Sequence, residues 1–387
     1  NYIRVSGLTV ENGANVFPVP QRGLISASRG HHWIIEDCTV RWANSQGIDV
    51  GNESWHRWRR LPGGPPREDR ENSGGHIIRR NHVSDCGICG IAAVGNNACT
   101  LVEDNLVERI GWHNIERVWE AGGLKFHTCN SGLFRRNIFR HISHAPGLWL
   151  DVHNSNCRMT ENVFADIASI KGALYLEMCF DRNLIDQNIF WDIRGDFDRP
   201  WSDIFESPGF AINIDTGEQC VIAHNLFGRV PDSYTVWVNL DQNKRLVAGR
   251  VGLCRQHRVL NNLFVGCPKR ILFGRLDDNR AEGNLYDVAD DWTSFCIEYP
   301  APKAVLNLFA WQTYYGQDKQ GAQSKITASF DPDTLALDLA VEGDLPTCAP
   351  VPATSSTRSC AAPPPLRNRK LNNESRRLCL SRYRLHR

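Results

Sequence analysis

The stretch LFRRNIF at residues 133–139 decides the fold, because close variants of it recur along most of the chain. Each variant has an apolar residue, two polar residues, an asparagine and then two mostly apolar residues. The variants are IIRRNHV (77–83), LVEDNLV (101–107), RMTENVF (158–164), LIDQNIF (184–190), VIAHNLF (221–227), VLNNLF (259–264) and AEGNLY (281–286). A phrase that returns every few tens of residues indicates a repeat protein.

The spacing of the asparagines gives the size of the repeat. Successive asparagines are 24, 32, 25, 26, 37, 37 and 22 residues apart. The short intervals define a coil of about 24–26 residues, and the long ones indicate coils that carry loop insertions. Each phrase alternates between apolar and polar residues and is bounded by Gly, Asn or Asp, which is typical of a short strand. An asparagine at a strand bend can hydrogen-bond to the asparagine of the next coil.

These features predict an all-β fold, a parallel β-helix. The fixed phrase of leucine-rich repeats is absent, and the blades of a β-propeller would need about twice this period. We expect residues 1–290 to form the solenoid and residues 291–346 to form terminal strands that cap it. Residues 347–387 are rich in Pro and Ser and then basic, so we expect a disordered tail. Residues 191–210 and 229–257 are predicted to be insertions that wall a cleft.

Composition excludes several classes of protein. Hydrophobic residues make up 42% of the chain and charged residues 22%, as in a soluble folded protein. The net charge of +1 indicates no nucleic-acid partner, and the absence of a long apolar run indicates no membrane span. The chain opens at Asn1 in the middle of the pattern, so we expect the N-terminus to be incomplete. Localisation therefore stays undetermined between a cytoplasmic and a secreted bacterial-type protein, and the oligomeric state, including a homo-oligomer, stays open.

The 14 cysteines are scattered singly apart from one C-x-x-C, at Cys86 and Cys89. A single C-x-x-C without a second pair of ligands is a weak zinc signal. Buried free thiols are the favoured interpretation. We predict no metal and no cofactor.

Four further segments fall into register when the coils are aligned on their asparagines. They are GLKFH (123–127), GLWLD (147–151), ALYLE (173–177) and AINID (211–215). Alternation along a strand sends their leucine, isoleucine and phenylalanine side chains inward. The outward side chains then form two columns, which are Lys125, Trp149, Tyr175 and Asn213, followed by His127, Asp151, Glu177 and Asp215.

The second column places acidic residues on successive coils. Neighbouring strands lie about 4.8 Å apart, so the carboxyl groups of Asp151 and Glu177 should lie about 5 Å apart. Stacked like charges are unfavourable in ordinary sheets, which indicates a functional reason for this pair. Repulsion should raise the pKa of at least one carboxyl group. Retaining glycosidases separate their two carboxyls by about 5–5.5 Å and inverting enzymes by about 6.5–9.5 Å. A retaining pair on adjacent coils is favoured over an inverting pair two coils apart, such as Asp151 and Asp215.

The first column supports a carbohydrate site. Trp149 and Tyr175, on an exposed strand face, would offer flat apolar surfaces to sugar rings, and Lys125 and Asn213 would offer hydrogen bonds. His127 is expected to orient Asp151 or bind substrate, and Asp215 to contact a sugar hydroxyl. The competing interpretation is that the aromatic residues stack for stability and that the acids bind a structural cation.

At these residues the chain resembles glycoside hydrolase family 120, the β-xylosidases on a right-handed parallel β-helix. The phrases that carry the resemblance are EAGGLKFH (120–127), GLWLD, ALYLE followed by NLIDQNIF (183–190), and CVIAHNLF (220–227). SGGHIIRRNHVSDCGICGI (73–91) and AWQTYYGQDKQ (310–320) are similar to flanking segments of such enzymes.

The resemblance implies an exo-acting retaining glycosidase on plant-type oligosaccharides. Asp151 would be the nucleophile and Glu177 the general acid/base. Glu120, which opens the first phrase, would contact substrate. Two alternatives stay open. One is a calcium-dependent polysaccharide lyase or uronate epimerase, which would use the acids as calcium ligands and Lys125 or an arginine as base. The other is a non-catalytic carbohydrate-binding solenoid.

Overall fold

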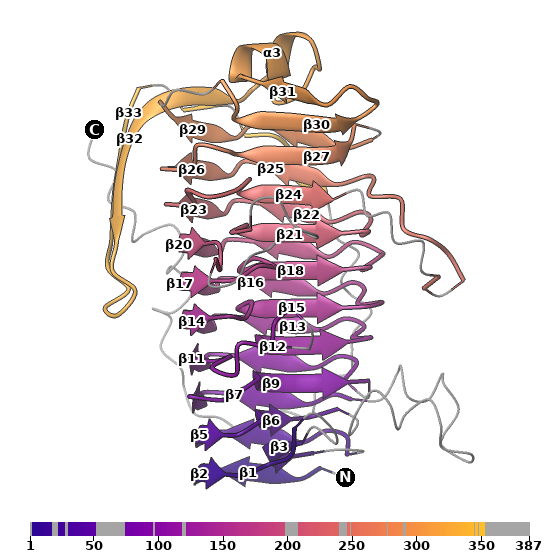
Figure 1. Cartoon of the computed structure of the whole chain (residues 1–387), viewed down its shortest axis with the longest axis vertical. Helices are drawn as coiled ribbons and strands as arrows, with labels where there is room; N and C mark the ends of the chain where they lie inside the picture. The colour runs from indigo at the N-terminus through magenta and orange to yellow at the C-terminus, as the bar shows by residue number, and fades with distance from the viewer. Residues whose placement is uncertain are drawn as a thin grey trace.

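The computed structural model shows a parallel β-helix, as the repeat predicts (Figure 1). Each coil contributes one short strand to each of three long sheets, so that every strand lies beside the equivalent strand of the next coil. The structure describes residues 2–352 apart from 18–21, 28–29, 52–73, 96, 118–120, 198–207, 240–245, 248, 277, 289–291, 344 and 347.

Two of the sheets contain the recurring phrase, one on each side of its asparagine. Over the described residues, the first sheet contains β1 (Arg4–Ser6), β4 (Ile34–Glu36), β7 (Ile77–Arg79), β10 (Leu101–Glu103), β13 (Leu133–Arg135), β16 (Arg158–Thr160), β19 (Leu184–Asp186), β22 (Val221–Ala223), β25 (Arg258–Leu260) and β28 (Arg280–Glu282). The second contains β2 (Thr9–Gly13), β5 (Thr39–Ala43), β8 (His82–Ser84), β11 (Leu106–Glu108), β14 (Ile138–Ser143), β17 (Val163–Ala168), β20 (Ile189–Arg194), β23 (Leu226–Gly228), β26 (Leu263–Val265), β29 (Leu285–Asp287), β32 (Ala322–Phe330) and β33 (Leu337–Glu342).

The third sheet carries the polar columns. Its described strands are β3 (Gly23–Ser26), β6 (Gln46–Asp49), β9 (Cys89–Val94), β12 (Gly122–His127), β15 (Leu148–Asp151), β18 (Leu174–Glu177), β21 (Ile212–Asp215), β24 (Val236–Asn239), β27 (Ile271–Arg275), β30 (Phe295–Tyr299) and β31 (Ala304–Leu306). All of its strand pairs are parallel except the last, β30 with β31. The interpretation of residues 229–257 as an insertion is therefore wrong over β24, which belongs to this sheet.

A ladder of buried asparagines holds the bend between the first two sheets. The backbone and side-chain amides of Asn137 both donate to Oδ1 of Asn162, at 3.0 Å each. Asn162 repeats the pattern with Asn188. The residue before each asparagine takes a left-handed conformation, such as Asp104 with φ 57° and Glu161 with φ 57°. This conformation makes the sharp bend that brings each asparagine over the next.

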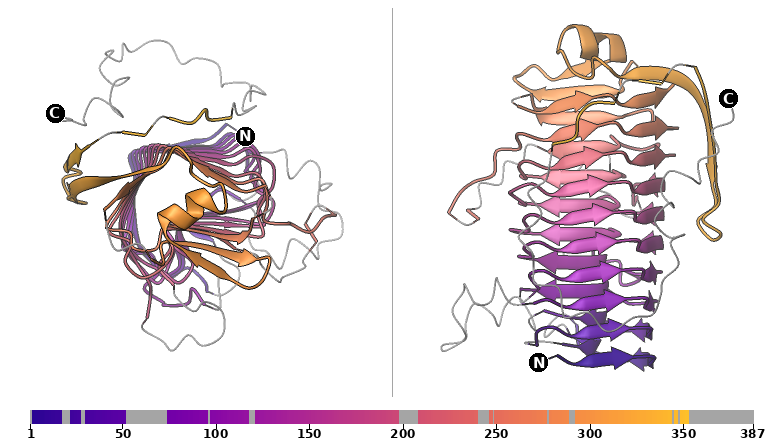
Figure 2. Two further views of the ribbon diagram at one scale, coloured as in Figure 1. Left: turned by 90° about the horizontal axis from the view of Figure 1, so that it is seen from above. Right: turned by 180° about the vertical axis from the view of Figure 1, so that it is seen from behind.

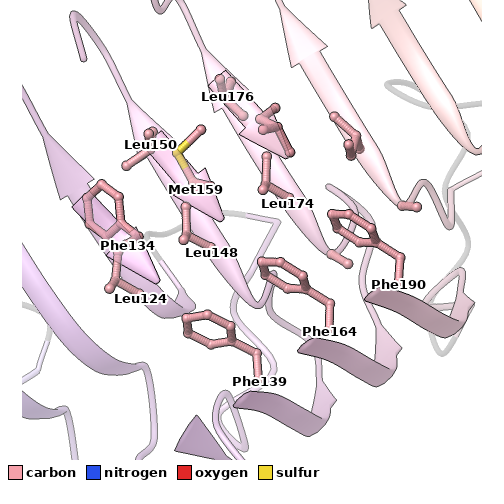
Figure 3. Packing of buried hydrophobic residues seen from close by; sticks show 14 of the residues in the cluster. Leu124, Phe134, Phe139, Leu148, Leu150, Met159, Phe164, Leu174, Leu176 and Phe190 are labelled. Carbon is pink, nitrogen blue, oxygen red and sulfur yellow. The ribbon is translucent and has the colours of Figure 1, made fainter. Parts of the chain in front are cut away.

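The interior of the solenoid is filled by residues that repeat from coil to coil (Figure 3). Phe139, Phe164 and Phe190 stack face to face, with ring centroids 5.1 and 4.7 Å apart. Leu124, Leu148 and Leu174 point into the same core from the third sheet and are fully buried. The predicted inward side of the alternation is therefore confirmed.

The C-terminal elements close one end of the solenoid and cover one side. The short helix α3 (Leu308–Thr313) lies over the end (Figure 2). Its Trp311 stacks on Phe295 with ring centroids 5.0 Å apart. The β32–β33 hairpin turns back along the second sheet, and Phe330 packs against Trp191 of β20. Residues 348–352 follow, and Ala349 packs on the outer face of the first sheet.

The remaining sequence expectations concern the membrane and the tail. No helix in the described part of the chain has the length and apolar character needed to cross a membrane. The predicted disordered tail beyond residue 352 lies outside the described residues.

Candidate active site

Four neighbouring strands of the third sheet bring the two polar columns together. In the register of β12, β15, β18 and β21, Lys125 lies opposite Trp149, and His127 lies opposite Asp151. The same register places Asp151 opposite Glu177 and then Glu177 opposite Asp215. The predicted alignment of the two columns is confirmed residue by residue. Asp151 and Glu177 therefore occupy adjacent positions on strands about 4.8 Å apart.

Asp151 lies beside two basic side chains. The ammonium nitrogen of Lys125 lies 2.9 Å from Oδ2 of Asp151, and Nδ1 of His127 lies 3.5 Å from the same oxygen. The three side chains are almost fully buried, with exposed fractions of 3%, 4% and 9% for Lys125, His127 and Asp151. A cation at this distance in a buried setting favours the charged form of the carboxylate.

The aromatic residues of the first column are buried, contrary to the expectation of an exposed strand face. Trp149 and Tyr175 each expose 4% of their surface, and their rings lie 5.3 Å apart. The ring of Trp149 has the ammonium of Lys125 3.0 Å from its centre and that of Lys171 3.8 Å from its centre. Trp149 is therefore surrounded by cations and a second ring, and its contacts are those of a cation–π partner.

Lys171 and Glu116 are charged residues of this region that the sequence pattern did not identify. Glu116 is buried, and its carboxylate accepts hydrogen bonds from the Ser169 hydroxyl at 2.5 Å and from the backbone amides of Ile170 and Lys171 at 3.1 Å each. Burial raises the pKa of Glu116, although the charge of Lys171 opposes this. Glu116 thereby fixes the segment that leads into β18.

Asp215 is held by two hydroxyl groups. The Tyr175 hydroxyl donates to Oδ2 of Asp215 at 3.2 Å, and the Thr216 hydroxyl donates to Oδ1 at 2.8 Å. Burial raises the pKa of Tyr175 well above its usual range, and the charges of Asp215, Glu177 and Asp151 add to this, so the phenol stays neutral. Both Glu177 and Asp215 are partly exposed, whereas Asp151 is buried. The acidic column is therefore partly accessible at β18 and β21 and buried at β15.

Asn213 is fully buried and binds the segment that carries Lys171. Its amide group donates to the Lys171 carbonyl at 3.1 Å, while its Oδ1 atom has no hydrogen-bond partner within the described structure. The Nε1 atom of Trp149 likewise is buried and has no hydrogen-bond partner within the described structure. These two buried polar atoms lie on the column predicted to bind substrate.

The columns continue onto a fifth strand. In β24, Trp237 lies opposite Asn213 and Asn239 lies opposite Asp215. The sequence VWVN (236–239) has the same alternation as LWLD in β15, and this signal could have identified the strand.

A segment from a later coil lies beyond the acidic column. Val247 packs on Met178 and Phe180, which follow Glu177 in the chain. Arg250 contacts the ring of Phe180 and pairs with Glu218 at 2.7 Å. This part of the predicted insertion 229–257 therefore packs on residues that follow Asp151 and Glu177 in the chain.

Two predictions concern residues elsewhere. Glu120 lies outside the described residues, so its predicted contact with substrate has no structural counterpart here. Cys86 and Cys89 are both buried and outside any disulfide bond, and burial raises the pKa of Cys86 to about 12. Within the described ranges, no group of three or more His, Cys, Asp and Glu residues is arranged to hold a metal ion.

Comparisons with known proteins agree with this architecture. Among solved structures, the chain is similar to XylC in its complex with xylose, with a TM-score of 0.50 and 19% sequence identity. The alignment covers 74% of this chain and 50% of XylC, so the chain spans about half the length of that protein. At this identity the likeness concerns the fold alone. No significant match to a curated protein was found.

A family comparison extends the likeness to a named group. Residues 2–227 match the right-handed β-helix region, and this span is more than half of the 387 residues. It includes β1 to β22 and most of β23, and therefore the four strands that carry the acidic column. By fold and by sequence, the protein belongs to the right-handed β-helix family.

Proposed function

We propose that the protein is a retaining glycoside hydrolase that removes sugar units from the ends of plant-type oligosaccharides, in the manner of a β-xylosidase. Asp151 is the nucleophile and Glu177 is the general acid/base. The observation that carries the proposal is the register of these two residues on adjacent strands, with the ammonium of Lys125 2.9 Å from Asp151. Retaining enzymes need two carboxyl groups about 5–5.5 Å apart, and adjacent strands provide about this spacing.

The different surroundings of the two acids support different roles. Asp151 is buried beside Lys125 and His127, an environment that favours a carboxylate ready to attack. Glu177 is partly exposed, as an acid/base that exchanges protons with water must be. The acid/base must reach the attacking water in the second step, whereas the nucleophile needs to reach only the sugar.

The reaction proceeds in two steps. In the first, an oxygen of Asp151 bonds to the anomeric carbon while the bond to the leaving oxygen breaks and Glu177 protonates that oxygen. In the second, water attacks the anomeric carbon, Glu177 takes up a proton from the water, and the ester bond to Asp151 breaks. Both carboxyl groups then return to their starting states.

Two likenesses support a sugar substrate. The phrases around Asp151 and Glu177 resemble those of β-xylosidases of glycoside hydrolase family 120. The solved structure of XylC, which shares the fold, contains bound xylose. A β-xyloside is therefore the first substrate to test.

The test is hydrolysis of aryl β-xyloside and a panel of other aryl glycosides, with and without EDTA. Release of the aryl alcohol in both conditions is expected. Asp151→Ala and Glu177→Ala should each lower the rate of this release by roughly a thousandfold or more. Azide should restore turnover in both variants but give glycosyl azides of opposite anomeric configuration. Full activity in either variant would overturn its assigned role.

The alternatives give different results in the same experiment. A calcium-dependent lyase would release unsaturated products from polyuronates, would lose activity in EDTA and would leave the aryl glycosides intact. A non-catalytic solenoid would bind sugars and turn none over. The ammonium of Lys125, 2.9 Å from Oδ2 of Asp151, would repel a calcium ion at this carboxylate. This arrangement favours the hydrolase.

A further inference from the structure

We propose that Lys171 is a positioning residue that sets the charge states of Asp151 and Glu177, and through them the pH range in which the enzyme works. This role rests on the glycosidase function proposed above and deepens it. Lys171 lies outside the two aligned columns, on the segment between β17 and β18.

The position of Lys171 is defined by the aromatic column. Its ammonium nitrogen lies 3.8 Å from the ring centre of Trp149, two residues before Asp151 on β15. The ring of Trp149 packs against that of Tyr175, two residues before Glu177 on β18. The amino group is therefore held beside the strands that carry both proposed catalytic carboxyls.

The backbone around Lys171 is held from two sides. Glu116 accepts hydrogen bonds from the amides of Ile170 and Lys171 and from the hydroxyl of Ser169. On the other side, Asn213 donates to the Lys171 carbonyl. Glu116 and Asn213 are both buried, so these contacts do not compete with bulk water. A lysine that served only solubility would need no such support.

Four charged groups act on the Lys171 ammonium. They are Lys125 from β12, Glu116 from the segment after β11, Asp151 from β15 and Glu177 from β18. Burial and, to a smaller extent, the charge of Lys125 lower the pKa of Lys171, the three carboxylates oppose them, and the resulting pKa is about 8. Lys171 therefore carries its proton at neutral pH and loses it in mildly alkaline solution.

This titration has a direct effect on the two carboxyls. The Lys171 ammonium favours the charged forms of Asp151 and Glu177, as any nearby cation does. It therefore keeps the nucleophile ionised at low pH. When Lys171 loses its proton, Glu177 retains its own proton more readily, which preserves the general acid in mildly alkaline solution.

The pH profile of kcat/KM tests this role. In Lys171→Met, the acid limb of the profile should move to higher pH by about one unit and the alkaline limb by less, because wild-type Lys171 has already lost much of its charge in mildly alkaline solution. Lys171→Arg, whose charge does not titrate, should keep the acid limb of the wild type and show a steeper alkaline limb. Lys325→Met, which removes an exposed lysine on β32, is the matched control and should leave both limbs in place. Wild-type limbs in Lys171→Met would overturn the proposal.

A second measurement requires no substrate. Lysine is rare in this chain, so the ¹³C resonance of the Lys171 side chain can be assigned by its loss in Lys171→Met and followed as pH is varied. Coupling between two titrating groups is reciprocal, so Glu177→Gln should lower the pKa of Lys171. A Lys171 titration that is unchanged by Glu177→Gln overturns the role of Lys171 alone. A wild-type protein that cleaves none of the glycosides overturns the proposed function and this role together.

Discussion

The ammonium nitrogen of Lys125 lies 2.9 Å from Oδ2 of Asp151, although the two side chains come from neighbouring coils of the solenoid. In register, Lys125 lies opposite Trp149 and not opposite Asp151, so the long lysine side chain reaches diagonally to the acid. The pair is almost fully buried, and a buried charge that loses its partner is strongly destabilised.

Lys125→Met should therefore lower kcat/KM on an aryl glycoside by about 100-fold, equivalent to roughly 3 kcal/mol. Methionine keeps most of the volume of the lysine side chain but cannot stabilise the Asp151 carboxylate. The measurement is steady-state hydrolysis, with Lys303→Met, which removes a half-exposed lysine near α3, as the control. Activity within twofold of the wild type would show that Asp151 does not depend on this ion pair.

Tyr175→Phe should raise KM by about tenfold and leave kcat nearly unchanged. The substitution removes only the hydroxyl that holds Asp215, and a hydrogen bond to a charged group contributes about 1.5–3 kcal/mol. The expectation follows from the proposed contact between Asp215 and a sugar hydroxyl. Circular dichroism should match that of the wild type, because the ring stays in place. An unchanged KM would argue that Asp215 does not bind substrate.

Asn162→Ala should destabilise the solenoid by about 2–4 kcal/mol, because it leaves buried donors and acceptors in two coils without partners. Asn162 accepts from Asn137 and donates to Asn188 and to the Phe134 carbonyl. Urea denaturation followed by fluorescence measures the loss. Ser143→Ala, at an exposed position of β14, should change stability little, and an equal loss in both variants would contradict a special role for the ladder.

Asp318→Asn should stabilise the protein at alkaline pH. Asp318 ends the asparagine ladder, where it accepts hydrogen bonds from Asn284 and Tyr286. Burial raises its pKa to about 6, against 3.8 for the usual carboxyl. A raised pKa means that the folded state prefers the protonated form, so this contribution to stability is present below about pH 4 and lost as pH rises through 6.

Asparagine avoids the cost of ionisation, so the substitution should raise the free energy of unfolding by about 3 kcal/mol at pH 8 and change it little at pH 4. Thermal unfolding at both values measures it. Asp338→Asn, on the exposed side of β33, should give no such pH-dependent difference. A gain of equal size at both pH values would contradict burial of an ionised Asp318.

The fold could be predicted because each coil repeats the same local chemistry. The alternation in LFRRNIF places Phe134 and Phe139 in the core, and Asn137 at the bend bonds to its counterparts above and below. Both properties depend only on the coil itself and its two neighbours, whose asparagines are 25 and 32 residues away in sequence. For the same reason, the repeat alone predicts the register of Asp151 with Glu177.

The surroundings of the site could not be predicted in this way, because they come from outside the repeating unit. The burial of Trp149 depends in part on Lys171, whose segment is fixed by Glu116 from a loop more than fifty residues earlier. No periodic signal links these residues. The strand β24 was missed for a different reason, since the long interval between Asn225 and Asn262 made its whole coil resemble an insertion.

The β32–β33 hairpin changes how the solenoid should come apart. In a chain of stacked coils each unit contacts only its neighbours, so unfolding can begin at an end and spread step by step. Here Asp333, at the tip of the hairpin, pairs with Arg140 on β14 at 3.0 Å, while Phe330 packs on β20. The hairpin therefore links several coils to one another and makes their unfolding more cooperative. Since residue 333 is synthesised long after residue 140, the central coils leave the ribosome before the hairpin can form its contacts with them.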